Sequence, residues 1–167
     1  MDRLIESTAS RSSWRPTVRR LMAGDADHYS AVYAIGRVDR ISIVKEGLPA
    51  RLLTRLADDM AVPRERLYGW IGIPRTTANR KVKDDEMLSQ DESERALGMT
   101  RLVGQVQRVV AESGEPEGFD AARWTADWLS ETNAALGGRT PGEFMDTADG
   151  RALVSGLVAQ MQSGAYA

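Results

Sequence analysis

A short stretch near the middle of the chain, GIPRTTANRKVKD at residues 72–84, combines a turn signal with side chains that contact nucleic acids. Arginine pairs with guanine, asparagine pairs with adenine, and threonine contacts phosphates or the methyl group of thymine. Lysine adds phosphate contacts, which make binding dependent on salt. The candidates for these contacts are Arg75, Thr76, Thr77, Asn79, Arg80 and Lys81.

The surrounding residues predict that this stretch is the second helix of a helix-turn-helix. We expect a first helix over 63–71, which Gly72 can end in a left-handed conformation. Pro74 suits the first turn of a second helix over 74–83. Two such helices joined by a short turn with glycine form the motif whose second helix enters the major groove of DNA. An exposed cationic helix on an ordinary bundle is the alternative.

The distribution of charge agrees with an anion-binding middle segment. The net charge of the chain is −2, but residues 45–83 carry nine Lys and Arg against four acids, whereas residues 84–167 carry six Arg against fifteen acids. Residues 1–44 are close to balanced, with seven Arg against five acids. Such a split favours an anionic partner for the middle of the chain, and chance placement of solvated charges is the alternative.

The composition gives little support for catalysis. Cysteine is absent, which removes disulfides, thiol nucleophiles and thiolate zinc sites and fits a cytoplasmic protein. His28 is the single histidine, and its neighbours in DADHYS do not predict a triad, because triad residues converge from separate elements. The acids of KDDEMLSQDESE lack the glycine and spacing of a calcium loop. We therefore expect no enzyme activity, no cofactor and no metal.

The rest of the sequence predicts a mainly α protein. Residues 1–20 are expected to be a flexible arm, and 29–44 could be helix or short strand, with 41–44 the best strand candidate. Ser89 and Glu92 form a capping box at the start of a long helix. The expected organisation is an arm and apolar segment over 1–44, a helix-turn-helix domain with the long helix over 45–112, and a C-terminal domain over 113–167.

The C-terminal domain shows further helix signals. Asp120 is a good N-cap for a helix over 121–136, which the two glycines that follow would end. The sequence TPGE at 140–143 forms a capping box with proline at the first helical position. A final helix is expected from about Arg151. The chain has no apolar run of about 18 residues, so we expect no membrane-spanning segment.

The sequence resembles the Xre/MbcA/ParS-type antitoxins, which neutralise RES-domain toxins. The resemblance is carried by NAALGGRTPGEFMDTADGRALV at 133–154 with SGAYA behind it, and by GIPRTTANRK followed by LSQDESERALGMTRL. It covers roughly residues 48–167. Two positions depart from the family pattern, since Pro74 stands where serine is frequent and Gly98 stands where arginine is common.

The resemblance implies an antitoxin with two partners. A helix-turn-helix would repress the operon of the protein by binding operator DNA as a homodimer or larger assembly. Trp70 and the apolar run 29–44 are candidates for the dimer interface. The C-terminal half would block the active site of a cognate RES-domain toxin that consumes NAD or transfers ADP-ribose. The implied toxin-binding residues are Asn133, Leu136, Gly137, Gly138, Thr140 and Pro141, together with a tail of Gly164, Ala165, Tyr166 and Ala167.

Two alternatives remain open at this point. The protein could be a plain helix-turn-helix regulator with a sensing C-terminal half. The tail could also be a frayed chain end that has no role in inhibition.

Overall fold

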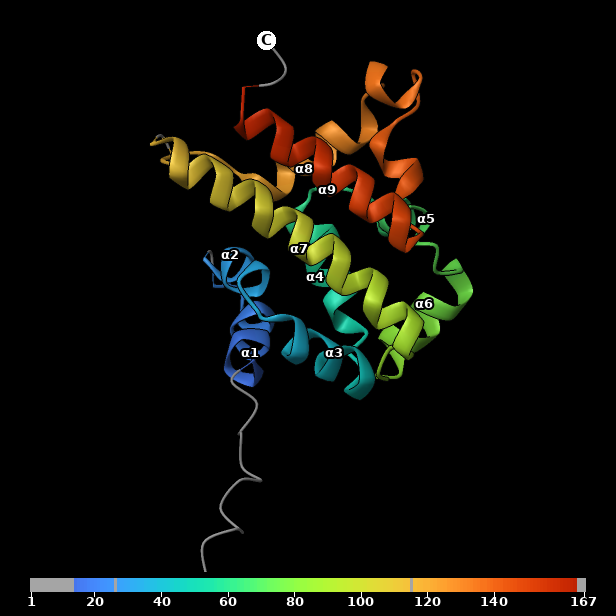
Figure 1. The fold of residues 1–167 in the computed structure, drawn as a ribbon. Coiled ribbons are helices and arrows are strands. Elements are labelled where there is room, and N and C mark those ends of the chain that lie inside the picture. The colour runs from blue at the N-terminus through green and yellow to red at the C-terminus, as the bar shows by residue number, and fades with distance from the viewer. Residues whose placement is uncertain (1–13, 26, 115, 165–167) are drawn as a thin grey trace, which may run out of the picture.

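The computed structural model describes residues 14–25, 27–114 and 116–164, and this part of the chain is built from helices (Figure 1). Two isolated β-bridges are its only strand-like pairings. The mainly α class is therefore confirmed. The helices are α1 (Arg15–Ala23), α2 (His28–Tyr33), α3 (Arg37–Glu46), α4 (Arg51–Asp59), α5 (Arg64–Ile71), α6 (Arg75–Lys83), α7 (Gln90–Ser113), α8 (Ala121–Ser130), η1 (Ala134–Leu136), η2 (Pro141–Phe144) and α9 (Ala148–Gln162).

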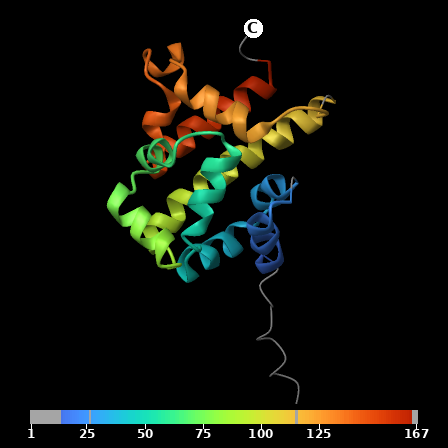
Figure 2. The same cartoon turned by 180° about the vertical axis from the view of Figure 1, so that it is seen from behind.

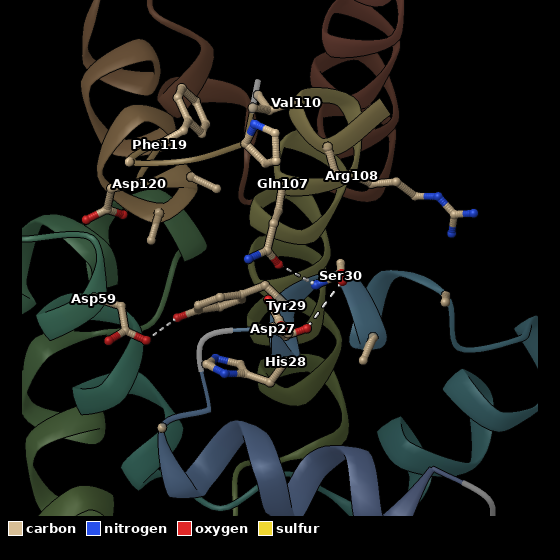
Figure 3. A pocket seen from close by; sticks show the side chains of 18 of the residues that line it. Asp27, His28, Tyr29, Ser30, Asp59, Gln107, Arg108, Val110, Phe119 and Asp120 are labelled. Carbon is tan, nitrogen blue, oxygen red and sulfur yellow. Dashed lines mark hydrogen bonds between the residues drawn. The ribbon is translucent and has the colours of Figure 1, made fainter. Parts of the chain in front are cut away.

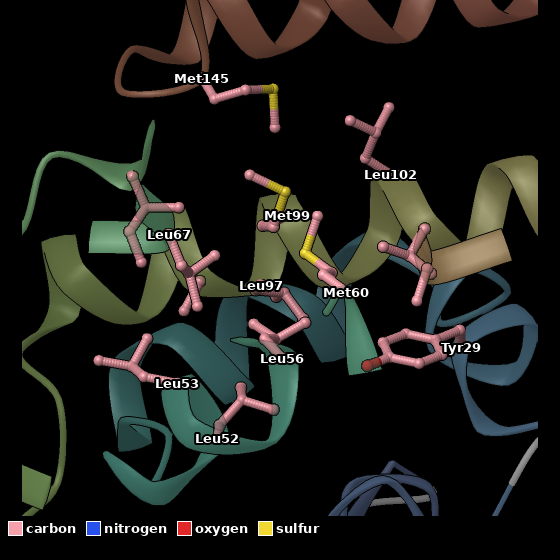
Figure 4. Close-up of a cluster of buried hydrophobic side chains, with 14 of the residues drawn as sticks. Tyr29, Leu52, Leu53, Leu56, Met60, Leu67, Leu97, Met99, Leu102 and Met145 are labelled. Atoms are coloured by element: carbon pink, nitrogen blue, oxygen red, sulfur yellow. The ribbon is translucent and has the colours of Figure 1, made fainter. Parts of the chain in front are cut away.

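The long helix α7 is the central element of the fold. It contacts α2, α3, α4, α5, α8 and α9. In Figure 4 it runs between the leucines of α4 on one side and Met145 on the other, with Met99 and Leu102 pointing from it into the core. Its start is fixed by the expected capping box, in which the Ser89 N–H donates to the Glu92 carboxylate at 2.7 Å. Helices from before and after α7 in the described part of the chain thus pack around this one helix.

The helix α2 lies so close to α7 that the contact requires a glycine. A Cβ atom at Gly104 would overlap the carbonyl group of Tyr29. The Tyr29 hydroxyl donates to Asp59 at 2.7 Å and so links α2 to α4 as well. The N-terminal residues from α1 onward therefore pack onto the helical body.

Two sequence-based expectations for the N-terminal region are wrong. Residues 15–20 are not an arm but part of α1, because Pro16 fits its first turn, Gly24 ends it with a φ of 87°, and Leu21 is buried. Residues 41–44 are not a strand but the middle of α3. The apolar residues of this run alternate poorly, and Ile43 alone among them is fully buried against α7, as one face of a helix requires. Residues 1–13 lie outside the described part of the chain.

The helix expected over 121–136 is shorter than predicted. Asp120 caps it as expected by accepting the Arg123 N–H at 3.0 Å, but α8 ends at Ser130. Asn133 is extended and its side chain accepts the Ala135 N–H, which gives the backbone a local alternative to the helix.

In the described part of the chain, no helix has both the length and the apolar character that crossing a bilayer needs.

Candidate functional site

The helices α5 and α6 form the expected helix-turn-helix geometry. They are joined by Gly72, Ile73 and Pro74, and Gly72 has a φ of 67°. Ile73 and Ala78 are buried and hold α6 on the body of the protein. One face of α6 is thus fixed by packing, and the opposite face is open to solvent.

The outward face of α6 carries most of the residues that the sequence singled out. The side chain of Arg75 is 69% exposed and lies 3.5 Å from Glu65, and that of Arg80 is 54% exposed and pairs with Glu86 at 2.6 Å. Thr76 is exposed and Thr77 is half-buried. The Asn79 side chain accepts the Tyr68 hydroxyl at 3.2 Å, which fixes its orientation on the surface. Apart from the half-buried Thr77 these residues are exposed to solvent, and the set of five is called the outward row below.

Lys81 lies on the other side of α6 from this row. Its ammonium group pairs with Glu92 at 2.6 Å, and the two side chains are only 13% and 11% exposed. Glu92 also belongs to the capping box of α7. The position of Lys81 therefore gives it a packing role between α6 and α7, and we do not include it among the proposed DNA contacts.

The start of α6 lacks a side-chain cap. Pro74 is at the N-cap position and makes no capping hydrogen bond, which follows from the departure noted in the sequence. The N–H groups of the first helical turn have no partner within a helix. Such groups bind phosphate well.

The predicted C-terminal motif forms a tight loop between α8 and α9. The Asn133 N–H donates to the Arg139 carbonyl at 2.9 Å, and the Gly138 N–H donates back to the Asn133 carbonyl at 3.0 Å. Leu136 is buried, and the Thr140 N–H donates to the Glu143 carboxylate at 2.8 Å. Backbone hydrogen bonds, the buried Leu136 side chain and the Glu143 carboxylate therefore hold the loop in shape.

The exposed surface of this loop includes both motif glycines and three residues outside the predicted set. Its exposed residues are small and uncharged except for Arg139. The Arg139 guanidinium carbon lies 4.6 Å from the centre of the Phe144 ring. Gly137 and Gly138 have φ values of 67° and 82°, and a Cβ on either would meet open space. The exposed residues are Ala134, Ala135, Gly137, Gly138 and Arg139.

One motif residue that the sequence reasoning missed is Gly142. A Cβ at Gly142 would overlap the Trp70 indole and lie 2.9 Å from the Leu129 carbonyl oxygen. Pro141 beside it is buried. Trp70 is therefore half-buried against the C-terminal loop, which leaves less of it exposed than expected, and its place in a dimer interface stays a prediction. The sequence held a signal for this close contact. Gly142 directly follows Pro141 inside a capping box, where alanine would favour the helix more than glycine does.

The tail of the molecule begins at Gly164, which is exposed and has a φ of 70°. The helix α9 ends just before it, with Ser163 as the C-cap. Figures 1 and 2 show the loop that follows α8 and the C-terminal end of α9 on the same upper edge, on opposite sides of it. Residues 165–167, which include the predicted Ala165, Tyr166 and Ala167, lie outside the described part of the chain.

A separate cavity of about 810 Å³ lies between α2, α7 and the segment before α8 (Figure 3). None of the predicted site residues lines it. His28 is buried at its floor, with both ring nitrogens lacking a hydrogen-bond partner among the described residues. Burial lowers the pKa of His28, and Asp59 opposes this shift. Ser30 donates to the Asp27 carbonyl and not to His28, so the geometry is not that of a triad.

Comparison with known proteins identifies the regions of the chain in which the two candidate surfaces lie. A family model described as the antitoxin Xre-like helix-turn-helix domain matches residues 39–101. A second, described as the antitoxin Xre/MbcA/ParS C-terminal toxin-binding domain, matches residues 117–164. A relative from Sphingobium sp. (strain YBL2), named Prs ADP-ribosylating antitoxin, is 41% identical over 139 residues, which are 83% of this chain and 87% of that protein. The chain therefore belongs to the Xre/MbcA/ParS antitoxin family, and it is not an enzyme but an antitoxin with a helix-turn-helix domain ahead of a toxin-binding domain.

Proposed function

We propose that the protein inhibits a RES-domain toxin by covering its active site and that it represses its own operon through α6. The toxin would consume NAD or transfer ADP-ribose, in line with the name of the relative, which refers to ADP-ribosylation. We place both proteins in the cytoplasm. The observation that carries the proposal is the upper edge on which the loop after α8 and the C-terminal end of α9 both lie.

This edge supports a single partner that contacts both features. The loop offers small residues and two glycines, so the backbone of a partner can approach closely. The tail, Gly164 to Ala167, follows α9 and would enter the pocket of the toxin, where Tyr166 could take the place of an aromatic ring of NAD. Tyrosine is also a frequent anchor at protein interfaces.

The DNA half of the proposal rests on the outward row of α6. Arg75, Thr76, Thr77, Asn79 and Arg80 are the proposed contacts. In Figures 1 and 2, α6 lies on the lower part of the molecule, away from the upper edge that carries the loop and the tail. This separation supports binding of DNA and toxin by one molecule at the same time.

We further propose that the protein acts as a homodimer. One helix-turn-helix covers only a half-site, and a dimer on a palindromic site is the usual arrangement. The helix α3 offers an apolar surface, because Val38 is 77% exposed and Ile41 is 51% exposed. Light scattering of the protein and of a variant with Ile41→Glu tests this. A dimer that Ile41→Glu converts to a monomer supports α3 as the interface, and a monomeric parent protein contradicts the proposal.

Deletion of residues 164–167 tests the inhibitory tail. The truncated protein is expected to co-purify with its toxin but no longer to block NAD consumption or protect cells. A second variant, Ala135→Arg, places a bulky charge on the exposed loop and is expected to weaken co-purification itself. Unchanged inhibition after truncation would show that the tail has no such role and that the loop surface alone covers the active site.

A gel-shift assay with the promoter region of the operon tests the second activity. The parent protein is expected to shift this DNA at low salt and to lose affinity steeply as salt increases. A protein that does not shift the promoter DNA at low salt would contradict repression through α6, while leaving the toxin-binding proposal untouched.

A further inference from the structure

A second cleft, of about 520 Å³, lies where α3 and α9 meet α7. Figure 1 shows α7 crossing the molecule between α3 and α9. Of the described residues that line the cleft, Glu94 is the single carboxylate. Five cationic residues line it, namely Arg37, Arg40, Lys45, Arg101 and Arg151. This concentration of positive charge belongs neither to the outward row of α6 nor to the C-terminal edge, and the cleft borders the exposed apolar side of α3 through Ile41.

Arg101 is the central cation of this cleft. Its Nε is buried and has no hydrogen-bond partner among the described residues. Its guanidinium lies 5.6 Å from the centre of the Tyr33 ring, on the α2 side of the cleft. Burial lowers the pKa of Arg101, and the nearby charge of Arg40 lowers it further. A buried guanidinium whose Nε has no hydrogen-bond partner, with a second cation nearby, attracts an anion.

Arg151 reaches the cleft from α9 because residue 98 has no side chain. A Cβ at Gly98 would lie 2.5 Å from the Arg151 Cδ, so the stem of Arg151 occupies the space over this glycine. The guanidinium donates to the Met145 carbonyl at 3.2 Å and pairs with Glu94 at 3.3 Å. The departure from the family pattern at position 98 thus has a structural consequence, since it admits an arginine from another helix.

The remaining walls of the cleft are apolar and include Ile41, Val44, Leu97 and Leu102. A cavity of this size is larger than one phosphate group needs and falls in the range of small-molecule sites, which are mostly apolar with a few fixed polar groups. Guanidinium groups bind phosphate oxygens through paired, charge-assisted hydrogen bonds. We propose that this cleft binds a phosphate-bearing small molecule of nucleotide size, with its phosphates between Arg40 and Arg101.

The position of the cleft favours a small molecule over DNA. No residue of α6 lines it, so DNA bound to the outward row of α6 is not brought to it by that contact. Its walls come largely from both matched regions, since most of α3 and the first half of α7 lie in 39–101 and α9 lies in 117–164. A ligand in this cleft would therefore stabilise the contact between the helix-turn-helix region and the toxin-binding domain.

Isothermal titration calorimetry of the full chain with pyrophosphate, ADP and adenosine tests this proposal. We expect ADP to bind with a stoichiometry of one per chain, pyrophosphate to bind more weakly, and adenosine not to bind. Arg101→Gln should weaken ADP binding at least about tenfold. Arg108→Gln is the matched control, because Arg108 lies on the same helix but is exposed and paired with Glu112 outside this cleft.

A circular dichroism spectrum shows whether Arg101→Gln is folded, and Arg40→Gln replaces it if it is not. The proposal is overturned if neither ADP nor pyrophosphate binds at about 10 mM. It is also overturned if adenosine binds as well as ADP, or if Arg108→Gln weakens binding as much as Arg101→Gln. Loss of duplex DNA binding in Arg101→Gln, without any binding of ADP, would overturn it in favour of a DNA-backbone contact.

Discussion

In α6, the residues that the sequence singled out mostly point their side chains to solvent, whereas in the 133–144 loop most of them point inward or have no side chain. Arg75 and Arg80 are exposed on a regular helix. Leu136 and Pro141 are buried, and Asn133 and Thr140 bond to their own loop. The motif residues of α6 are thus mostly exposed groups that could contact a partner. Those of the 133–144 loop mainly fix the shape of the loop.

The two capping boxes repeat this contrast. In both, a glutamate accepts the N–H of the N-cap residue, from Ser89 to Glu92 and from Thr140 to Glu143. Glu92 is buried and shares its carboxylate with Lys81 from α6. Glu143 is exposed and has Arg139 beside it at 3.4 Å. The first box therefore joins two helices, and the second closes only its own loop.

The largest expected effect separates the two faces of α6. Lys81→Ala leaves the Glu92 carboxylate buried without its cation, and we expect it to lower the free energy of unfolding by about 3 kcal/mol. Lys83→Ala, two residues along on the exposed side, should change it by less than about 0.5 kcal/mol. Urea unfolding of both variants measures the difference. Similar effects of the two substitutions would mean that α6 has no distinct inner and outer face.

The next effect concerns glycine in the C-terminal motif. Gly142→Ala places a methyl group against the Trp70 indole and the Leu129 carbonyl, and we expect a loss of about 2 kcal/mol in the free energy of unfolding. Gly156→Ala is the control, because Gly156 is an exposed helical position with open space around it. That substitution should raise the free energy of unfolding by up to about 1 kcal/mol. A harmless Gly142→Ala would show that the seam between Trp70 and the loop is not tightly packed.

The sequence was a good guide where one residue type has one structural use. The capping box at Ser89, the N-cap at Asp120 and the glycine that ends α5 were all predicted and are found, because each depends only on neighbouring residues. The inward position of Lys81 depends on a carboxylate on another helix, and the packing of Trp70 on Gly142 depends on a segment about seventy residues away. Local pattern cannot show such pairings, which the tertiary fold decides.

Substitutions in the outward row of α6 should affect DNA binding and not stability, the opposite of what we expect for Lys81→Ala. We expect Arg75→Ala and Arg80→Ala each to weaken promoter binding by about 1–3 kcal/mol if they contact bases, with little change in stability. Arg108→Ala removes an exposed arginine of α7 and should leave promoter binding nearly unchanged. Fluorescence anisotropy at one fixed salt concentration measures all three. An equal loss in Arg108→Ala would indicate general electrostatic attraction in place of a defined reading face.

The smallest expected effect compares the glutamates of the two capping boxes by their response to acid. Burial alone would raise the pKa of Glu92, but the hydrogen bonds from Lys81 and Ser89 outweigh it, and the pKa is lowered. The Thr140 N–H, with Arg139 nearby, lowers the pKa of Glu143. Each carboxylate therefore stabilises the fold above its ordinary value of 4.5, and this contribution is lost as the pH falls through the lowered pKa of the folded state.

Replacing either glutamate by glutamine removes this pH-dependent stabilisation. The variant should therefore lose less stability than the parent protein as the pH falls from about 5 through the pKa of the glutamate. We expect Glu92→Gln to flatten this dependence more than Glu143→Gln, because the exposed Glu143 is screened by solvent and salt. Urea midpoints measured in steps from neutral pH to below 4.5 give the comparison. At neutral pH, Glu92→Gln should be the less stable of the two, since it also weakens the contact with Lys81. If Glu143→Gln flattens the curve as much as Glu92→Gln, the C-terminal box contributes as much to folding as the one that joins α6 to α7, and the contrast between the two regions fails.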